Sequence, residues 1–450
     1  MTDLLGMYPS WYVPFIGSAW VMGIIGTIHV LASHTSVGAS WLFALLEQKA
    51  YKENKPYLME YIKKYGMFLL VFSYIIGSIT GPGIWYAITV ASPRGVGGLI
   101  HNFVWVWAAE WVYFTVEVIG VYALVYTIGK VDKLTHLKLT WSFALASWAT
   151  MLLIVGILSF MMWPGNDAYY ETGSSLDAFF NLNFFAHLGV RTTFMFAIAG
   201  VVGTILASRM EVPEQRAEIA RFLAKVGIAG ALGTIVMFMW YIQTLPENAK
   251  IILTTQIPSY FAPTVAGVYL AVITWLAFVA WQPQRVTLVA ASTMTAVLAI
   301  GGLWPEERTR ESMRKPFVAG QYVYANQVIA RDVPGKGIHA EVDALAEHGF
   351  LKLHPWIPDN MRTITEANKL QVGRMLTVIA CANCHSVEPG APLRSLSDKF
   401  GNTTEPAIIK GFLDGVLQNG LSPYMPKIAL PEQEREAIAA YIASLGKTQP

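Results

Sequence analysis

Five residues near the C-terminus, Cys381-Ala382-Asn383-Cys384-His385, hold the only two cysteines of the 450-residue chain. A Cys-x-x-Cys pair followed directly by His is typical of c-type haem attachment, in which both thiols form thioethers and the imidazole ligates the iron. A bare Cys-x-x-Cys also occurs in redox dithiols and as half of a zinc site, but the chain offers no second ligand pair. The spacing therefore predicts one covalent haem c, held by Cys381, Cys384 and His385.

Ionisable side chains also lie inside long apolar segments, where they are costly and mark functional sites by default. This set consists of His29, His34, Glu47, Glu110, Glu117, His187 and Arg191. Glu110 and Glu117 share one helix face, about 10 Å apart along the axis. A single residue of this kind can simply be hydrogen-bonded between helices. Taken together, and without matching counter-charges, the set favours haem ligands and a proton path.

The elements that must position these residues are membrane helices. Apolar residues make up 54% of the chain and charged residues only 14%, against about 25% charged residues in soluble domains. A spanning helix needs about 20 apolar residues. We therefore predict an all-α, polytopic membrane helix bundle with eight spans, at 15–46, 67–91, 98–128, 136–163, 179–207, 222–245, 263–282 and 286–304. With so few basic residues, a nucleic acid partner is not expected.

Lys and Arg in the loops predict the orientation, because they accumulate on the cytoplasmic side. The first, third, fifth and seventh loops hold thirteen of them, whereas the alternate loops hold only Arg94 and Lys250. A further cluster after the last span disagrees, although acidic residues are interleaved with it: Arg308, Arg310, Arg314 and Lys315. We expect a multi-pass protein of the bacterial inner membrane, with the N-terminus and the C-terminal domain on the periplasmic side. Covalent haem attachment is expected on that side too.

The chain divides into three parts: a transmembrane haem-binding domain at 1–305, a polar connector on the outer face at 306–365, and a small helical domain at 366–450. In the last part, a predicted helix at 369–379 leads into the haem motif and another at 431–445 closes the chain. This region resembles the small class I cytochrome c fold. The resemblance implies that Met425, in Tyr424-Met425-Pro426, is the second axial ligand of the haem c iron, and His/Met ligation raises the potential of an iron.

The transmembrane part resembles subunit I of cytochrome bd oxidases, on Ile28-His29, Glu47, Tyr65-Gly66 and Thr80-Gly81. The resemblance implies that His29 and Glu110 ligate high-spin haem iron and that Glu117 lies beside the haems. The two glutamates are seven residues apart, whereas eight is the spacing expected in the family. His187 would ligate a low-spin haem b. The implied cofactors are one or two haem b, with haem d as a further candidate.

Three departures from this family concern the entry of electrons. The loop at 246–262 is too short for the long quinol-binding loop, and the segment 263–267 lacks the Met that would complete the low-spin haem site. Met237 and Met239 are alternative ligands. The ninth helix is replaced by the C-terminal domain, so a c-type haem takes the place of the quinol site.

These expectations predict an oxidase in which electrons pass from the c-type haem through the His187 site to the catalytic residues His29, Glu110 and Glu117. Protons would arrive through Glu117 with His34 or Glu47, and Arg191 would pair with a haem propionate. The implied partners are a second membrane subunit, a periplasmic cytochrome c or other redox protein, and oxygen. One alternative is a non-oxidase conduit between a quinone pool or membrane complex and periplasmic cytochrome c. A transporter with a sensory haem domain is a third reading, but paired broken helices are not evident.

Overall fold

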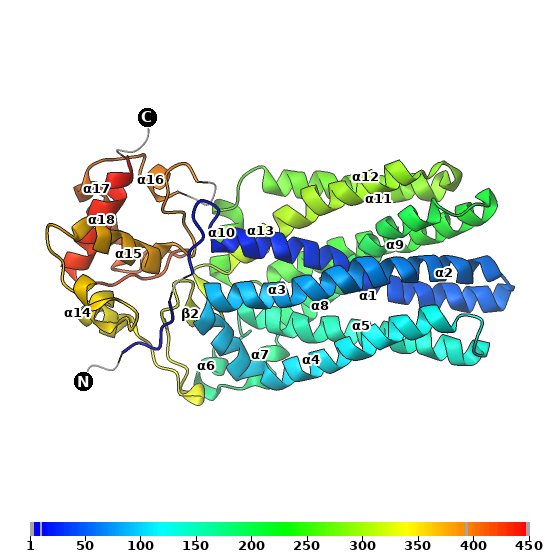
Figure 1. The fold of residues 1–450 in the computed structure, drawn as a ribbon, viewed down its shortest axis with the longest axis horizontal. Coiled ribbons are helices and arrows are strands. Elements are labelled where there is room, and N and C mark those ends of the chain that lie inside the picture. Colours follow the sequence, from blue (N-terminus) through cyan, green and yellow to red (C-terminus); the bar gives the residue numbers. More distant parts are fainter. Residues whose placement is uncertain (1–3, 10, 392–394, 447–450) are drawn as a thin grey trace.

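The computed structural model describes residues 4–9, 11–391 and 395–446, in which a long helix bundle carries a smaller helical part at one end (Figure 1). Eight helices in this part of the chain are long and apolar enough to cross a membrane. They are α1 (Ser18–Glu53), α2 with α3 (Pro56–Leu69 and Ile76–Ala91), α4 (Pro93–Thr127), α5 (Lys133–Met162), α8 (Leu182–Ala207), α9 (Pro213–Gln243), α11 (Phe261–Trp281) and α12 with α13 (Leu288–Val297 and Trp304–Met313). The predicted all-α polytopic membrane bundle is confirmed.

The ends of these helices are set by local chemistry. Asn54, in the left-handed conformation at φ 52°, ends α1, and Pro56 begins α2 two residues later. Asp132 caps α5, because its carboxylate accepts the backbone N–H groups of Leu134 and Thr135 at 3.1 and 3.0 Å. Asn181 caps α8 in the same way, through Phe184 N at 2.9 Å.

Two of the spans are interrupted by π-helical turns, at Leu70–Ile75 between α2 and α3 and at Leu298–Leu303 between α12 and α13. Pro82 lies inside α3, and α4 is bent at Phe103, whose φ and ψ of −132° and 25° are not helical. Prolines and π-helical turns are common causes of helix distortion and often occur near functional sites. The helices α3 and α4 both border the cavity described below.

Helix α8 packs closely against α1 and α2. A Cβ on Gly38 of α1 would lie 2.2 Å from the carbonyl oxygen of Met195 in α8, so only glycine permits this approach. Tyr61 and Tyr65 of α2 are fully buried and donate their hydroxyls to the carbonyls of Gly203 and Ala199. Because α8 is held so closely, its polar side chains occupy fixed positions relative to α1.

The last span does not end where the apolar run ends. Helix α13 continues through Pro305 to Met313, so Arg308 and Arg310 lie in its final turns and Arg314 follows directly. This helix therefore crosses the predicted boundary at 305. The charges that disagreed with the loop count belong to the end of a span rather than to a free loop.

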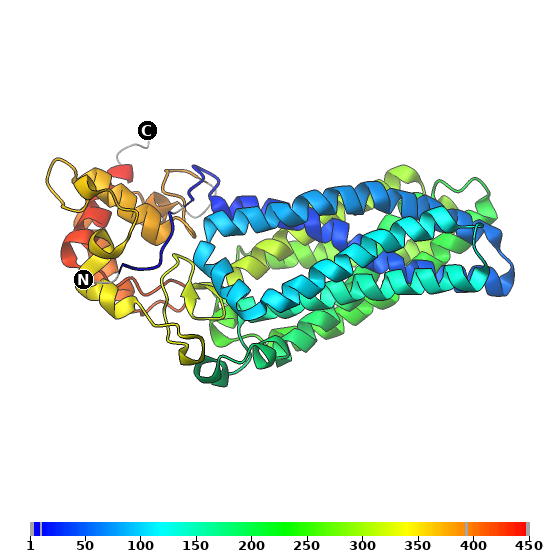
Figure 2. The same cartoon turned by 60° about the horizontal axis from the view of Figure 1, so that its bottom comes forward.

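The remaining elements are short, and the helices from residue 342 onward form the helical part at one end of the bundle (Figure 2). They are α6 (Ala168–Thr172), α7 (Ser175–Phe179), α10 (Glu247–Thr255), the antiparallel strands β1 (Phe317–Ala319) and β2 (Val323–Tyr324), α14 (Val342–Leu353), α15 (Lys369–Cys381), α16 (Leu396–Lys399), α17 (Pro406–Phe412) and α18 (Glu432–Gly446). Single turns of 3-10 helix lie at Pro283–Arg285, Pro334–Lys336 and Asp359–Met361, and a π-helical turn lies at Leu413–Leu417.

The C-terminal part is built on the crossing of α15 and α18. A Cβ on Gly373 of α15 would lie 2.1 Å from the carbonyl oxygen of Ala437 in α18, so the two backbones are in direct contact. The core around this crossing also takes in Phe350 of α14 and Leu5 and Met7 of the N-terminal segment. The connector and the chain start thus share one hydrophobic core with the residues around the cysteine motif.

Candidate functional site

A cavity of about 410 Å³ lies inside the bundle, between α1, α3, α4, α5 and the end of α13. Its walls are largely apolar and aromatic, and its polar lining includes most of the predicted site residues: His29, His34, Glu110, Glu117 and Arg191. The structure therefore brings together side chains from α1, α4 and α8 that lie up to 162 positions apart in the sequence. His187 is not among the lining residues.

The ring of His29 is oriented by Thr80 of α3. The Thr80 hydroxyl lies 2.7 Å from the carbonyl of Ile76 and 3.0 Å from Nδ1 of His29. When its proton is donated to that carbonyl, the hydroxyl accepts from Nδ1–H of His29. In the described part of the chain, this is the only hydrogen bond of the ring. Nε2 of His29 is then the unprotonated nitrogen, which is the form that ligates metals, with the other nitrogen fixed by a hydrogen bond. The site fits an iron ligand.

Glu110 and Glu117 differ in their surroundings, although both line the cavity. Glu117 is buried, and its Oε1 accepts the hydroxyls of Tyr74 at 2.8 Å and Ser36 at 3.1 Å. Glu110 is only partly buried. Among the described residues, neither carboxyl has a Lys, Arg or His within ion-pair distance. Glu110 is thus a carboxyl available to a cavity ligand, and Glu117 belongs to a hydrogen-bonded cluster.

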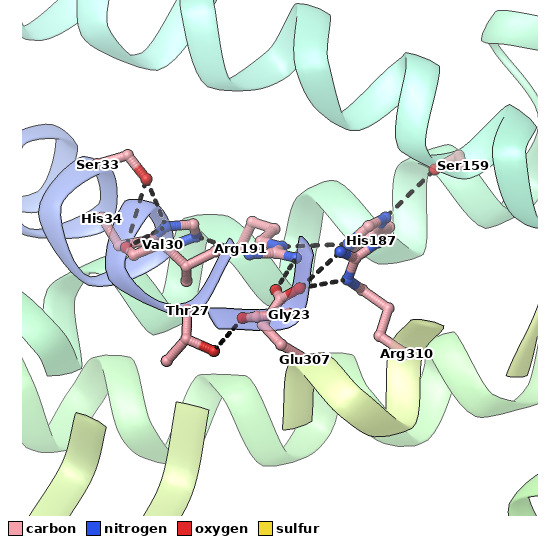
Figure 3. A network of polar contacts seen from close by, with 10 residues as sticks. All are labelled: Gly23, Thr27, Val30, Ser33, His34, Ser159, His187, Arg191, Glu307 and Arg310. Carbon is pink, nitrogen blue, oxygen red and sulfur yellow. Dashed lines mark hydrogen bonds and ion pairs between the residues drawn. The ribbon is translucent and has the colours of Figure 1, made fainter. Parts of the chain in front are cut away.

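A buried polar network joins α1, α8 and α13 beside the cavity (Figure 3). Arg191 is its centre: Nε donates to Nε2 of His187 at 3.2 Å, and Nη1 donates to Nε2 of His34 at 3.4 Å. Its Nη2 pairs with Glu307 Oε1 at 3.5 Å, and Glu307 is also bound by Arg310 at 2.6 Å. Because Nδ1 of His34 can only donate to the carbonyl of Val30, its Nε2 is the acceptor. Both imidazoles are therefore neutral hydrogen-bond acceptors of one guanidinium.

This network bears on the predicted low-spin haem b. Nε2 of His187 accepts from Arg191, and Nδ1 lies 3.5 Å from Ser159 Oγ. Met237, an alternative second ligand, packs against Gly189, which is two residues from His187 and therefore on nearly the opposite face of α8. Met239 is 56% exposed. The side chains as they stand suit hydrogen bonding by His187, and ligation of an iron by its Nε2 requires the Arg191 hydrogen bond to break.

A second buried carboxyl lies farther along the bundle. Glu47 of α1 is fully buried; its Oε1 is 2.6 Å from Nδ1 of His136, and its Oε2 accepts the Thr140 hydroxyl at 2.5 Å. Nε2 of His136 contacts the carbonyl of Leu124 at 3.0 Å. Glu47 is eleven residues after Ser36 in α1, which corresponds to about 16 Å along the axis. This cluster therefore lies well beyond the Glu117 cluster, toward the end of the bundle remote from the C-terminal part.

The cysteine motif lies at the end of α15, in the C-terminal part. Burial raises the pKa of the Cys381 thiol to about 12, with the neighbouring Cys384 as the second cause. Both cysteines are partly exposed, at the surface of the C-terminal core. Met425 packs against the same core as Cys381. The residues therefore fit a covalently attached haem with an axial methionine.

The loop after the motif is covered by the N-terminal segment, defined here as residues 4–9 and 11–17. The Tyr12 hydroxyl donates to the carboxylate of Glu388 and accepts the N–H of Val387 at 3.2 Å. The carbonyl of Phe15 accepts the hydroxyl of Ser386 at 3.1 Å. This segment leads directly into α1, which carries His29, so one short stretch connects the two predicted haem sites.

Sequence reasoning missed three residues of this arrangement: His136, Glu307 and Arg314. His136 stands at the start of a span, and the rule that an ionisable residue within a span is functional would have identified it. Glu307 and Arg314 look like residues of a charged outer segment, since they follow the apolar run. Only the continuation of α13 and its packing against α1 place them at the cavity.

No protein-family model matches the sequence, and no curated protein sequence is significantly similar to it. Among solved structures, the chain is similar to the bd oxidase from Geobacillus thermodenitrificans, with a TM-score of 0.53 and 13% sequence identity, over 66% of this chain and 85% of that chain. At this identity the likeness concerns the fold alone. It supports the predicted bd-oxidase-like membrane helical fold.

Proposed function

We propose that the chain is a membrane-bound respiratory oxidoreductase, which passes electrons between a periplasmic c-type haem and haem in its transmembrane part and reduces oxygen to water. The observation that carries this proposal is the convergence of His29, Glu110 and Glu117 on one internal cavity. The presence of a Cys-x-x-Cys-His motif in the same chain, and a fold similar to that of a bd oxidase, support it.

Haem bound at these sites supplies one-electron redox chemistry, at a potential set by its axial ligands. The residues that would hold it are Cys381, Cys384, His385 and Met425 for haem c, and His29 and Glu110 for a haem b or haem d in the cavity. The role of Thr80 is to keep Nε2 of His29 unprotonated and facing a ligand. His187 remains the candidate ligand of a further haem b. To bind that iron through Nε2, it would have to lose the hydrogen bond that Arg191 donates.

The chain's own carboxyls would handle the protons that oxygen reduction consumes. A buried carboxyl without a cationic partner is held at lower cost in its neutral form, so Glu117 is suited to store a proton beside the cavity. Tyr74 and Ser36 hydrogen-bond to it and fix its position. Glu47 and His136 form a second exchangeable pair on the side remote from the C-terminal part. Protons would therefore arrive from the end of the bundle opposite to the predicted haem c.

The proposal includes the surroundings expected from the sequence. The chain would lie in the bacterial inner membrane with its N-terminus and C-terminal part in the periplasm. Its electron donor there would be a soluble cytochrome c or another redox protein. A second membrane subunit would accompany it, as the resemblance to bd oxidase subunit I implies.

Oxygen uptake by the purified protein with reduced cytochrome c as donor tests the proposal directly. We expect uptake that is lost in His29→Ala, together with a carbon monoxide difference spectrum from the non-covalent haem. A pyridine haemochrome assay would count that haem against the covalent haem c. One non-covalent haem per haem c would leave His187 as a hydrogen-bonding residue, and two would support its role as a ligand.

Two outcomes would contradict an oxidase. A fully low-spin spectrum without carbon monoxide binding, together with no oxygen uptake, would identify a conduit that exchanges electrons between a quinone pool or membrane complex and periplasmic carriers. Absence of covalent haem from protein matured in a host with c-type haem attachment would remove the electron entrance at Cys381 and Cys384.

A further inference from the structure

Arg314 is a buried cation that lines the same cavity and lacks a carboxylate partner. Its side chain is attached one residue after the end of α13, and the residue is only 6% exposed. Nη1 of Arg314 contacts the sulfur of Met161 at 3.7 Å, and Nε has no hydrogen-bond partner among the described residues. A guanidinium presents five N–H donors and cannot be neutralised at ordinary pH. The structure thus leaves strong donors unused at a cavity wall.

Two carboxylates of α13, Glu307 and Glu311, are already engaged with other cations. Glu307 binds both Arg191 and Arg310, and Glu311 binds Arg308 at 2.6 Å. Within the described residues, no ion pair of Arg314 lies within 4.0 Å. A buried charge without a partner is costly.

The cavity extends from this cation to the predicted iron ligands. His29 and Glu110 lie on its walls, as do the aromatic rings of Trp85 and Trp107. A ligand that satisfies all of these groups has a flat apolar body, a centre that accepts a nitrogen ligand, and an acidic group at its edge. Arg191 already has three partners in the network of Figure 3, and Arg310 is paired with Glu307. Arg314 is therefore the arginine of the cavity wall without a carboxylate partner among the described residues.

We propose that Arg314 binds a carboxylate of the ligand that fills this cavity, and that this carboxylate is a propionate of the haem held at His29. The inference rests on the proposed function, because it takes the cavity ligand to be haem. It adds an orientation: the propionate edge faces the end of α13. Arg314 is a binding residue in this role, and Arg191 instead serves to hold Glu307, His34 and His187 in place.

The test compares haem with haem dimethyl ester, in which both propionates are blocked. Full-length protein produced in cells deprived of haem synthesis is titrated with each ligand in detergent. We expect the wild-type protein to prefer haem by about tenfold or more, since a hydrogen bond to a charged group changes an affinity roughly 10- to 150-fold. Arg314→Gln should lower the affinity for haem about tenfold and leave the affinity for the ester unchanged. Arg314→Lys, which keeps the charge, should retain part of the preference.

Arg331→Gln is the matched control, because Arg331 is a half-exposed arginine outside the cavity, paired with Asp167. A second measurement uses protein purified with its haem in place, so that it does not depend on folding without haem. Removal of a positive charge beside the haem favours the oxidised iron, so Arg314→Gln should lower the midpoint potential of the non-covalent haem. The covalent haem c in the same sample should keep its potential.

The outcomes separate this inference from the function it rests on. Equal wild-type affinity for haem and its ester, or an unchanged midpoint potential in Arg314→Gln, would overturn the role of Arg314 and leave the oxidase proposal intact. Haem binding with the expected preference, but without oxygen uptake, would support Arg314 and contradict the oxidase. Failure of the wild-type protein to carry any non-covalent haem would overturn both.

Discussion

At the scale of single residues, function depends on which nitrogen or oxygen is left available. The Thr80 hydroxyl favours a proton on Nδ1 of His29 when its own proton is donated to the carbonyl of Ile76. In His34 and His187, by contrast, the unprotonated nitrogen is not available to a ligand, because it accepts a hydrogen bond from Arg191. Three intramembrane histidines with similar sequence surroundings thus have different chemical roles.

Replacement of Thr80 tests the orientation of His29. Thr80→Val keeps the shape of the side chain and removes the hydrogen bond to Nδ1, so we expect a 10- to 100-fold loss of affinity for the cavity haem, the usual effect of removing the partner of a ligating histidine. Non-covalent haem content and the carbon monoxide difference signal measure it. Thr27→Val is the control, because the Thr27 hydroxyl donates only to the carbonyl of Gly23 in its own helix. Equal haem content in both variants would contradict the role of Thr80.

At the scale of elements, the sequence predicts the spans well and their ends poorly. Hydropathy identifies the apolar window of each span, but caps decide where the helix stops: α1 continues past its apolar run to Asn54. Helix α13 continues because Glu and Arg are good helix formers, which hydropathy does not register. The candidate ligands were found singly, as ionisable residues in spans. Their convergence on one cavity, and the burial of Glu307 and Arg314, depend on packing that no local pattern encodes.

The N-terminal segment is an element that sequence reasoning did not assign, and its contacts can be measured. Tyr12→Phe removes the hydroxyl that contacts Glu388 and Val387. A net hydrogen bond contributes about 1 kcal/mol, so amide hydrogen exchange in the loop at 386–388 should accelerate roughly fivefold. Tyr8→Phe, at an exposed tyrosine of the same segment, should leave the exchange unchanged. Unchanged exchange in Tyr12→Phe would show that the segment does not restrain the loop.

At the scale of the whole molecule, the C-terminal part is held to the connector by a buried carboxylate. Glu434 of α18 accepts the N–H groups of Phe350 and Leu351 in α14 at 3.0 and 2.9 Å. Burial raises its pKa to about 7, and these two N–H groups only partly oppose the shift. A carboxyl with a raised pKa in the folded state stabilises the fold most when protonated. Its contribution is therefore complete below pH 4.5 and is lost as the pH rises through 7.

Thermal unfolding of the C-terminal part, followed through its haem c absorbance, tests this pH dependence. Between pH 5 and pH 8 the wild-type protein should lose stability relative to Glu434→Gln, by an amount on the order of 3 kcal/mol for the full shift. Glu432→Gln, at an exposed position on the same helix that pairs with Lys410, should follow the wild-type protein. If the stability of the wild-type protein and of Glu434→Gln changed with pH in the same way, the raised pKa would not belong to Glu434.

The cover that the N-terminal segment forms over residues 386–388 also has a consequence for biosynthesis. The segment is translated long before the loop that it contacts, so the contacts of Tyr12 and Phe15 cannot form until residues 386–388 have been made. The cysteines of the motif lie immediately before that loop. The N-terminal segment would therefore reach its final place only after the residues that carry the predicted haem c have been made.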